Sequence, residues 1–282
     1  MNDVGFVCAY FNPLENQARY ENYFEFAERI QKKATLVTVE LSIGDSAFQL
    51  PETDLTIRLH SDSFLWHKER LLQIGAERLR QLKFAKIGWL DSDIVFLNDD
   101  WMEQISQALD TSNFIQCFRS AAMSFDDQSF TVPGAVSSLL EEQSVVLPAS
   151  GGAWAARGDF FDQVGLFDKC VVGGFDMLLV GAFFGGLHGS FHGYGAPFRE
   201  QAGKWIQQVQ SYVKLGVADN KLVFLPHGTL ASRRYGKRHA LMDGFDPEQH
   251  VAYNRDGVLE WSPEADYSAG VRQYFCEREQ SA

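Results

Sequence analysis

The chain has 282 residues and an ordinary globular composition, with 45% hydrophobic and 22% charged residues. This length allows one large α/β domain or two small ones. The formal net charge of −12 argues against a nucleic acid as a bulk partner, because proteins that bind polyanions usually gather basic residues against the phosphates.

The cysteines and the N-terminal residues indicate a cytoplasmic protein. Four cysteines lie far apart without CxxC spacing, which favours free thiols in a reducing compartment over a zinc site: Cys8, Cys117, Cys170 and Cys276. The opening "MNDVGFVCAYFNP" lacks the basic region and long apolar run of a signal peptide. No stretch approaches the ~18 uninterrupted apolar residues that span a membrane, so we expect no transmembrane segment.

The first hundred residues predict strands that alternate with helices. Short apolar or alternating runs predict strands at Val4–Phe11, Ala34–Ser42, Asp54–His60 and Ala85–Leu90. Helices are expected at two segments with apolar residues at helical spacing: 15–33, with Tyr20, Phe24, Ala27 and Ile30, and Phe64–Leu82, with Leu65, Leu72, Ala76 and Leu79. This order predicts an α/β fold with a mainly parallel, doubly wound sheet, which binds ligands at the carboxyl ends of its strands.

The rest of the chain is less regular. Residues 120–150 mix serine, proline and acidic residues, and we interpret them as a long excursion over the active face. Beyond it the sequence predicts strands at Ala153–Ala156 and Lys221–Gly228, and helices at Asp159–Val164, from near Asp176, and at Arg199–Leu215. No repeat or linker divides the chain, so we expect one domain over 1–282, with a nucleotide-sugar-binding half (1–100), an acceptor and catalytic half (101–240) and a C-terminal extension (241–282).

Two carboxylates one residue apart end the predicted strand at Ala85–Leu90. Asp91 and Asp93 repel each other, and burial makes that arrangement costly. A divalent cation such as Mn²⁺ or Mg²⁺ prefers oxygen ligands and would offset the repulsion, as well as bind a nucleotide diphosphate. A bare D-x-D is a weak signal, since an aspartate at this place can also cap a turn.

Several segments in order resemble the GT-A glycosyltransferases. "IGWLDSDIVF" is similar to their D-x-D segment, "FVCAYFNP" to their first strand, and "ASGGAWAARGDFFDQVGLFDKCVVGGFDMLLV" to their second half. The resemblance extends over roughly Val4 to His227. It implies a GT-A type mixed sheet, a nucleotide-sugar donor, with a UDP-sugar as the first expectation, and a Mn²⁺ or Mg²⁺ cofactor.

The resemblance also implies a donor site. Asp91 and Asp93 would hold the metal and the diphosphate, with Asp93 as the more direct ligand. Tyr10, Phe11 and Asn12 would lie near the base and ribose, and Glu40 could accept from the base. Lys68 and Arg70 occupy the helix where related enzymes place a basic residue near the nucleotide, although both could equally lie on a solvated helix face.

Asp176 matches the catalytic acidic motif of the family. Inverting members usually have Glu-Asp there, with the aspartate as general base, whereas this chain has Phe175-Asp176. Asp176 could instead cap the helix that follows it.

A C-terminal histidine and a basic cluster complete the implied site. His227 would be a third metal ligand, although a lone histidine is more often structural. The cluster "RRYGKRH" offers Arg234 and Arg238, four residues apart, to neutralise the departing diphosphate, but it could also be an exposed basic turn.

The sequence therefore predicts a metal-dependent glycosyltransferase that acts with inversion on an unknown acceptor, expected to be a carbohydrate or another small molecule. The missing glutamate keeps a retaining mechanism open. A nucleotidyltransferase is a second alternative, although "YFNPLENQ" lacks the glycine-rich basic loop that such enzymes need after the first strand. A non-catalytic carbohydrate-binding protein is the third.

Overall fold

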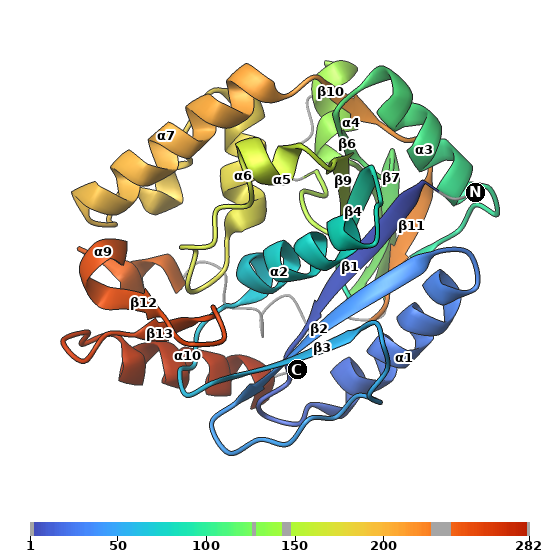
Figure 1. Cartoon of the computed structure of the whole chain (residues 1–282). Helices are drawn as coiled ribbons and strands as arrows, with labels where there is room; N and C mark the ends of the chain where they lie inside the picture. Colours follow the sequence, from blue (N-terminus) through green and yellow to red (C-terminus); the bar gives the residue numbers. More distant parts are fainter. Residues whose placement is uncertain (1–2, 126–127, 143–147, 227–237, 281–282) are drawn as a thin grey trace.

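A seven-stranded mixed sheet forms the centre of the computed structural model, which describes residues 3–125, 128–142, 148–226 and 238–280 (Figure 1). The strand order is β10-β6-β9-β4-β1-β2-β3. The strands are β1 Val4–Tyr10, β2 Thr35–Ile43, β3 Thr56–Ser61, β4 Lys86–Leu90, β6 Phe114–Gln116, β9 Ala153–Arg157 and β10 Leu215–Val217. Only β9 runs against its neighbours β4 and β6 within this sheet. The prediction of a mixed α/β sheet is confirmed.

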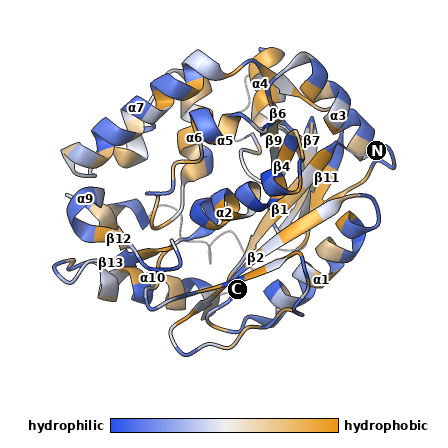
Figure 2. Cartoon of the chain, in the orientation of Figure 1, coloured by the Kyte–Doolittle hydropathy of each residue, from blue (hydrophilic) through white to orange (hydrophobic). Residues whose placement is uncertain are grey.

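Both faces of this sheet are buried, which explains why its strands are almost continuously apolar. Side chains alternate between faces along a strand, so Phe6 and Cys8 of β1 enter one core while Val7 enters the other. Helices α1 Gln17–Gln31 and α3 Trp101–Thr111 cover the first face. The second face is covered by α2 Lys68–Gln81, α5 Phe160–Gln163, α6 Phe175–Phe184 and α7 Ala196–Tyr212. In Figure 2, α1 and α7 mix hydrophilic with hydrophobic residues, as expected of amphipathic helices that pack on the sheet with one face.

The predicted helices occur where expected, but the set of buried residues in the first helix differs from the expected one. Helix α1 begins after Asn16, whose side-chain oxygen accepts a hydrogen bond from the Arg19 backbone N–H. Its buried residues are Tyr23, Phe26, Ala27 and Ile30. Ala27 and Ile30 of the expected set are thus buried and Phe24 packs partly buried against the core, whereas Tyr20 is replaced by Tyr23 and Phe26. Helix α2 buries Leu72, Ala76 and Leu79 as expected, but Leu65 is buried ahead of the helix.

A second, four-stranded sheet contradicts the expected excursion at 120–150. Its order is β5-β11-β7-β8, with β5 Ile94–Phe96, β7 Ser120–Phe125, β8 Gln128–Pro133 and β11 Lys221–Phe224. Strands β7 and β8 are antiparallel neighbours, and α4 Ala135–Leu140 follows them. The small and polar residues of β7 and β8 gave no apolar period from which these strands could be predicted. Strand β8 forms an edge of the sheet, where even Phe130 is exposed.

The C-terminal part folds back on the second face of the central sheet. It contains η2 His239–Met242, α9 Pro247–His250, a ribbon of β12 Val251–Tyr253 and β13 Leu259–Trp261, and α10 Ser268–Gln280. A further short turn, η1 Gly189–Phe191, precedes α7. Helix α10 buries Val271, Tyr274 and Phe275 in the core that α2 also shares. Among the described helices, none combines the length and apolar character needed to cross a membrane.

Helix α2 approaches the sheet through Gly75. A β-carbon there would lie 2.2 Å from Val7 Cγ2 and 3.0 Å from Val39 Cγ2. We therefore expect Gly75→Ala to lower the free energy of unfolding by about 1–3 kcal/mol, although alanine is the better helix former. Chemical denaturation measures this.

The matched control is Gly203→Ala in α7, where a β-carbon would meet nothing within 4 Å. It should raise the free energy of unfolding by about 0.5–1 kcal/mol. Equal stabilisation by both substitutions would show that α2 does not pack this closely on β1.

Candidate active site

Asp91 follows the last residue of β4 and is fixed by the start of β9. The Asp91 backbone N–H donates to the Gly152 carbonyl over 2.7 Å, and the Gly152 N–H donates to Asp91 Oδ2 over 3.2 Å. Gly152 has a φ of +97°, and a β-carbon there would lie 2.8 Å from the Phe224 ring. Glycine is thus required for the backbone to reach the Asp91 carboxylate.

Lys68 brings two separate carboxylates together. It is the first residue of α2, and its Nζ lies 2.7 Å from Asp91 Oδ1 and 3.7 Å from Asp176 Oδ2. The three side chains are 14%, 27% and 30% exposed, respectively. The repulsion between these half-buried carboxylates at this edge of the sheet is therefore offset by an ammonium of the chain itself.

Asp176 reaches the same point from the start of α6. A β-carbon at Gly151 would lie 3.1 Å from Asp176 Oδ2 and 3.6 Å from Asp91 Oδ2, so both carboxylates face this backbone. Gly174 occupies the position before the helix with a φ of +105°. Among the described residues, Asp176 makes no hydrogen bond to a backbone N–H, which disfavours the alternative of a simple cap.

Phe175 explains why the Glu-Asp pattern is absent. Its side chain is buried in the core, with its ring centroid 5.5 Å from that of Trp205. A glutamate at this position would place a charge in an apolar environment.

The charges of the cluster are coupled. Burial raises the pKa of Asp91 to about 6, and the neighbouring Asp176 and Asp93 add to this, while the Lys68 ammonium opposes it. Burial lowers the pKa of Lys68, but the Asp176 and Asp91 carboxylates outweigh that and hold it above its ordinary value. Lys68 is therefore a permanent cation at neutral pH.

Glu69 is a buried carboxyl beside this cluster that the sequence did not single out. Its Oε2 is buried without a hydrogen-bond partner, and burial raises its pKa from 4.5 to about 8. Glu69 is therefore largely protonated at neutral pH. The sequence did not predict this burial, because a glutamate in the first turn of an amphipathic helix is usually exposed.

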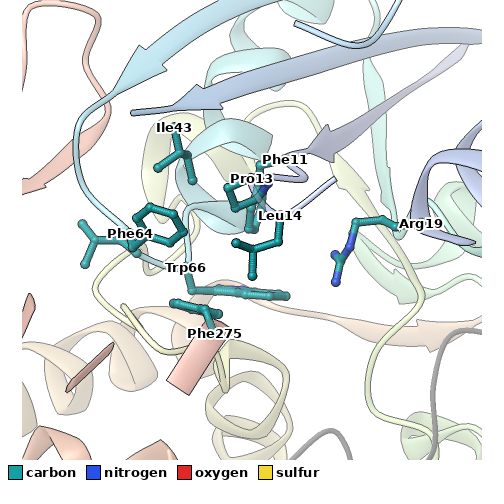
Figure 3. Close-up of a pocket in the computed structure, with 9 residues that line it drawn as sticks. Phe11, Pro13, Leu14, Arg19, Ile43, Phe64, Trp66 and Phe275 are labelled. Atoms are coloured by element: carbon teal, nitrogen blue, oxygen red, sulfur yellow. The ribbon is translucent and has the colours of Figure 1, made fainter. Parts of the chain in front are cut away.

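An apolar pocket lies beside the segment that leads into α2 (Figure 3). It is lined by residues that follow β1, end β2 and precede α2, and by one residue of α10: Phe11, Pro13, Leu14, Arg19, Ile43, Phe64, Leu65, Trp66 and Phe275. The rings of Trp66 and Phe275 are stacked, with centroids 6.3 Å apart and an angle of 12°. Trp66 is two residues before Lys68, so the pocket and the cluster adjoin.

Arg238 lies between the pocket and α6. A β-carbon at Gly173 would lie 3.2 Å from Arg238 Nη1 and 3.5 Å from Trp66 Cδ2. The Arg238 Nε donates to His239 Nε2 over 3.3 Å. A guanidinium thus sits close to the backbone that leads into Asp176.

The remaining predicted donor residues divide into two groups. Phe11 lines the apolar pocket, whereas the Tyr10 hydroxyl donates to Gln49 and the Asn12 amide bonds to the turn at Asn16. Asn12 does line a second, open hollow together with Gln49.

Glu40 and Arg70 are engaged elsewhere. Glu40 Oε1 accepts from the backbone N–H groups of Gln49 and Leu50. Arg70 donates to the Gly257 carbonyl and lies over the Tyr253 ring. These contacts hold a loop and the β12–β13 ribbon, so the structure does not bring Arg70 to the carboxylates. The predicted His227 and Arg234 lie outside the described residues.

The described residues do not fit a divalent ion at Asp91 while Lys68 is in place. Lys68 Nζ and the Gly152 N–H already donate to the two oxygens of Asp91. No cluster of three or more histidine, cysteine, aspartate or glutamate residues with metal-site geometry occurs in the described parts of the chain. An ion at this place would require Lys68 to move away.

No protein-family model matches the chain, and no curated protein matches it. It is similar to a solved structure from Desulfovibrio desulfuricans G20, described as a candidate nucleotide-diphospho-sugar transferase. That match has 9% identity, covers 100% of this chain and 99% of the other, and has a TM-score of 0.36.

Two further structures contain a nucleotide and a metal. A Drosophila β-1,4-galactosyltransferase 7 complex with manganese, UDP-Gal and xylobiose is 9% identical over 95% of this chain and 98% of the other, with a TM-score of 0.39. Glucosyl-3-phosphoglycerate synthase from Mycobacterium tuberculosis, with Mg²⁺ and UDP, is 10% identical over 92% and 87%, also with a TM-score of 0.39. Glycosyltransferases are thus among the structural matches, but identities and TM-scores this low carry no argument about activity.

Glu69 generates a prediction about pH. Because its pKa is raised in the folded chain, the folded state keeps a proton that the unfolded state has released, and stability is lost as pH rises toward about 8. Between about pH 6.5 and about pH 9 the free energy of unfolding should fall by about 2 kcal/mol, since one pKa unit corresponds to about 1.36 kcal/mol and the loss levels off above the folded pKa of about 8. Denaturation at several pH values measures it.

Glu69→Gln should abolish most of this slope, because a neutral amide has no proton to lose. Glu77→Gln, on an exposed position of the same helix, should keep it. A wild-type chain whose stability is flat over this range would contradict a buried neutral Glu69.

Proposed function

We propose that the chain is a glycosyltransferase that moves a sugar from a nucleotide-diphosphate sugar to a carbohydrate or another small acceptor. The observation that carries this proposal is the convergence of Asp91, Asp176 and Lys68 at the carboxyl edge of the central sheet. An aromatic hollow of about 20 Å³ leads toward it. The hollow is too small to enclose a base, so a planar base would stack on the exposed side of its rings while a charged group lies at the cluster.

The donor would lie along this edge. The base would pack against Phe11 and Trp66, and the diphosphate would reach toward Lys68 and Arg238. Cations near the diphosphate stabilise it as it leaves with a growing negative charge. Mn²⁺ or Mg²⁺, if bound, would supply further positive charge there, with Asp93 as the expected protein ligand and the donor's own oxygens as others.

Asp176 would be the general base. Its carboxylate would accept the proton of the acceptor hydroxyl as the oxygen attacks the anomeric carbon. The bond between that carbon and the diphosphate oxygen breaks in the same displacement, so the configuration inverts. A retaining mechanism remains the alternative, and it would leave Asp176 to position the acceptor or the donor sugar.

A panel of nucleotide sugars tests the proposed function directly. We expect slow release of the nucleoside diphosphate from at least one UDP- or GDP-sugar, and a higher melting temperature with that diphosphate. Release of pyrophosphate from a nucleoside triphosphate and a sugar phosphate would instead support a nucleotidyltransferase. Binding of sugars without turnover of any donor would indicate a carbohydrate-binding protein.

Asp176→Asn separates chemistry from binding. It should lower kcat by about 10²–10⁴-fold, the usual worth of a positioned base, with little change in donor KM. Asp162→Asn, which removes an exposed carboxylate paired with Arg80, should leave both constants unchanged. Near-normal turnover with a lower melting temperature would return Asp176 to a structural role. NMR of the product would report inversion or retention.

A further inference from the structure

Two lysines each bridge two aspartates, at opposite ends of β4. Lys86 is the first residue of β4, and its Nζ lies 2.7 Å from Asp3 Oδ2 and 2.6 Å from Asp110 Oδ1. Lys68 does the same beyond the end of the strand with Asp91 and Asp176. The partners of Lys86 are 48% and 66% exposed, so water screens that group more than it screens the group at Lys68.

Lys68 leaves little room for another cation at Asp91. Its ammonium is at direct hydrogen-bond distance from Oδ1, and the other oxygen accepts from Gly152. A Mg²⁺ or Mn²⁺ ion needs ligand oxygens at about 2.0–2.2 Å, so it would compete for the same lone pairs. It would also meet the repulsion of the ammonium across a poorly solvated space.

The backbone beneath Lys68 is held firmly. The Trp66 N–H donates to the Val171 carbonyl over 2.8 Å, and the buried His67 ring bonds to the Ser63 carbonyl. Gly75 seats the same helix directly on Val7 and Val39. The stem of Lys68 is therefore directed at the carboxylates by the packing of α2, and its contact is not that of a freely moving surface side chain.

We propose that Lys68 is the built-in cation of this site. Its ammonium lies between Asp91 and Asp176 and occupies the Asp91 carboxylate, which the D-x-D pattern assigns to a divalent metal, so the chain alone binds no Mn²⁺ or Mg²⁺ at Asp91. This inference concerns the carboxylates and the lysine only, and it does not depend on the donor being a nucleotide sugar.

Titration of the full chain with Mn²⁺ in the absence of nucleotide, followed by electron paramagnetic resonance, tests the inference. The wild type and Asp91→Asn should bind Mn²⁺ equally weakly. Lys68→Met should gain a site at least about tenfold tighter, because no like charge then repels the ion. The double variant Lys68→Met with Asp91→Asn should lose that site again, and the matched control Lys86→Met should titrate like the wild type.

Two results would overturn the inference. One is a wild-type Mn²⁺ site that Asp91→Asn abolishes. The other is a folded Lys68→Met chain that gains no site. Should Lys68→Met fail to fold, the comparison of the wild type with Asp91→Asn still decides. Since no donor is present, an inactive enzyme in the nucleotide-sugar panel would leave this outcome untouched.

Discussion

The contact between one ammonium and two carboxylates is the constraint on which this edge of the molecule depends. Lys68, Asp91 and Asp176 come from the start of α2, the end of β4 and the start of α6. Each would be costly to bury alone, and removing one partner of such a group leaves the others uncompensated. The raised pKa of Asp91, at about 6, shows that burial and like charge still outweigh the lysine there. The three elements must therefore be docked together for any of the three charges to be tolerated.

The surrounding backbone is adapted to this contact. Gly152 lets the start of β9 donate to Asp91, and Gly174 turns the chain into α6 with a left-handed conformation that L-residues rarely adopt. The same region borders the aromatic pocket, whose far wall is Phe275 from α10 (Figure 3). Residues from the first and last thirty positions of the chain thus line one hollow beside the charged cluster. The affinity for a ligand that contacts both the hollow and the cluster would therefore depend on whether α10 is packed in place.

Much of this could be predicted from the sequence, for a physical reason. Periodic apolar runs located β1, β2, β4 and α2, and the rule that ligands bind at the carboxyl ends of parallel strands singled out Asp91. The resemblance to the GT-A glycosyltransferases added Asp176 and Lys68. The pattern did not reveal their contact, because spacing along the chain says nothing of which cation meets which carboxylate. The β7–β8 hairpin was missed because edge strands with small and polar residues lack an apolar period. Trp66, Phe275 and Glu69 were missed because their roles arise only from tertiary packing.

The first turn of α2 contains two unfavourable residues, Lys68 and Glu69, and the fold accommodates them in different ways. A lysine at a helix N-terminus faces the positive end of the dipole, which costs about 0.3–1 kcal/mol, and a buried glutamate costs more. The carboxylates of Asp91 and Asp176 offset the first cost directly, so local conflict is resolved by a tertiary contact. Glu69 has no such partner for its Oε2, and its neutral form is the means by which the fold accommodates it. A single turn thus holds a permanent cation that faces the carboxylates and, one residue on, a buried acid whose charge the fold suppresses, so Glu69 adds no further negative charge beside Asp91 and Asp176.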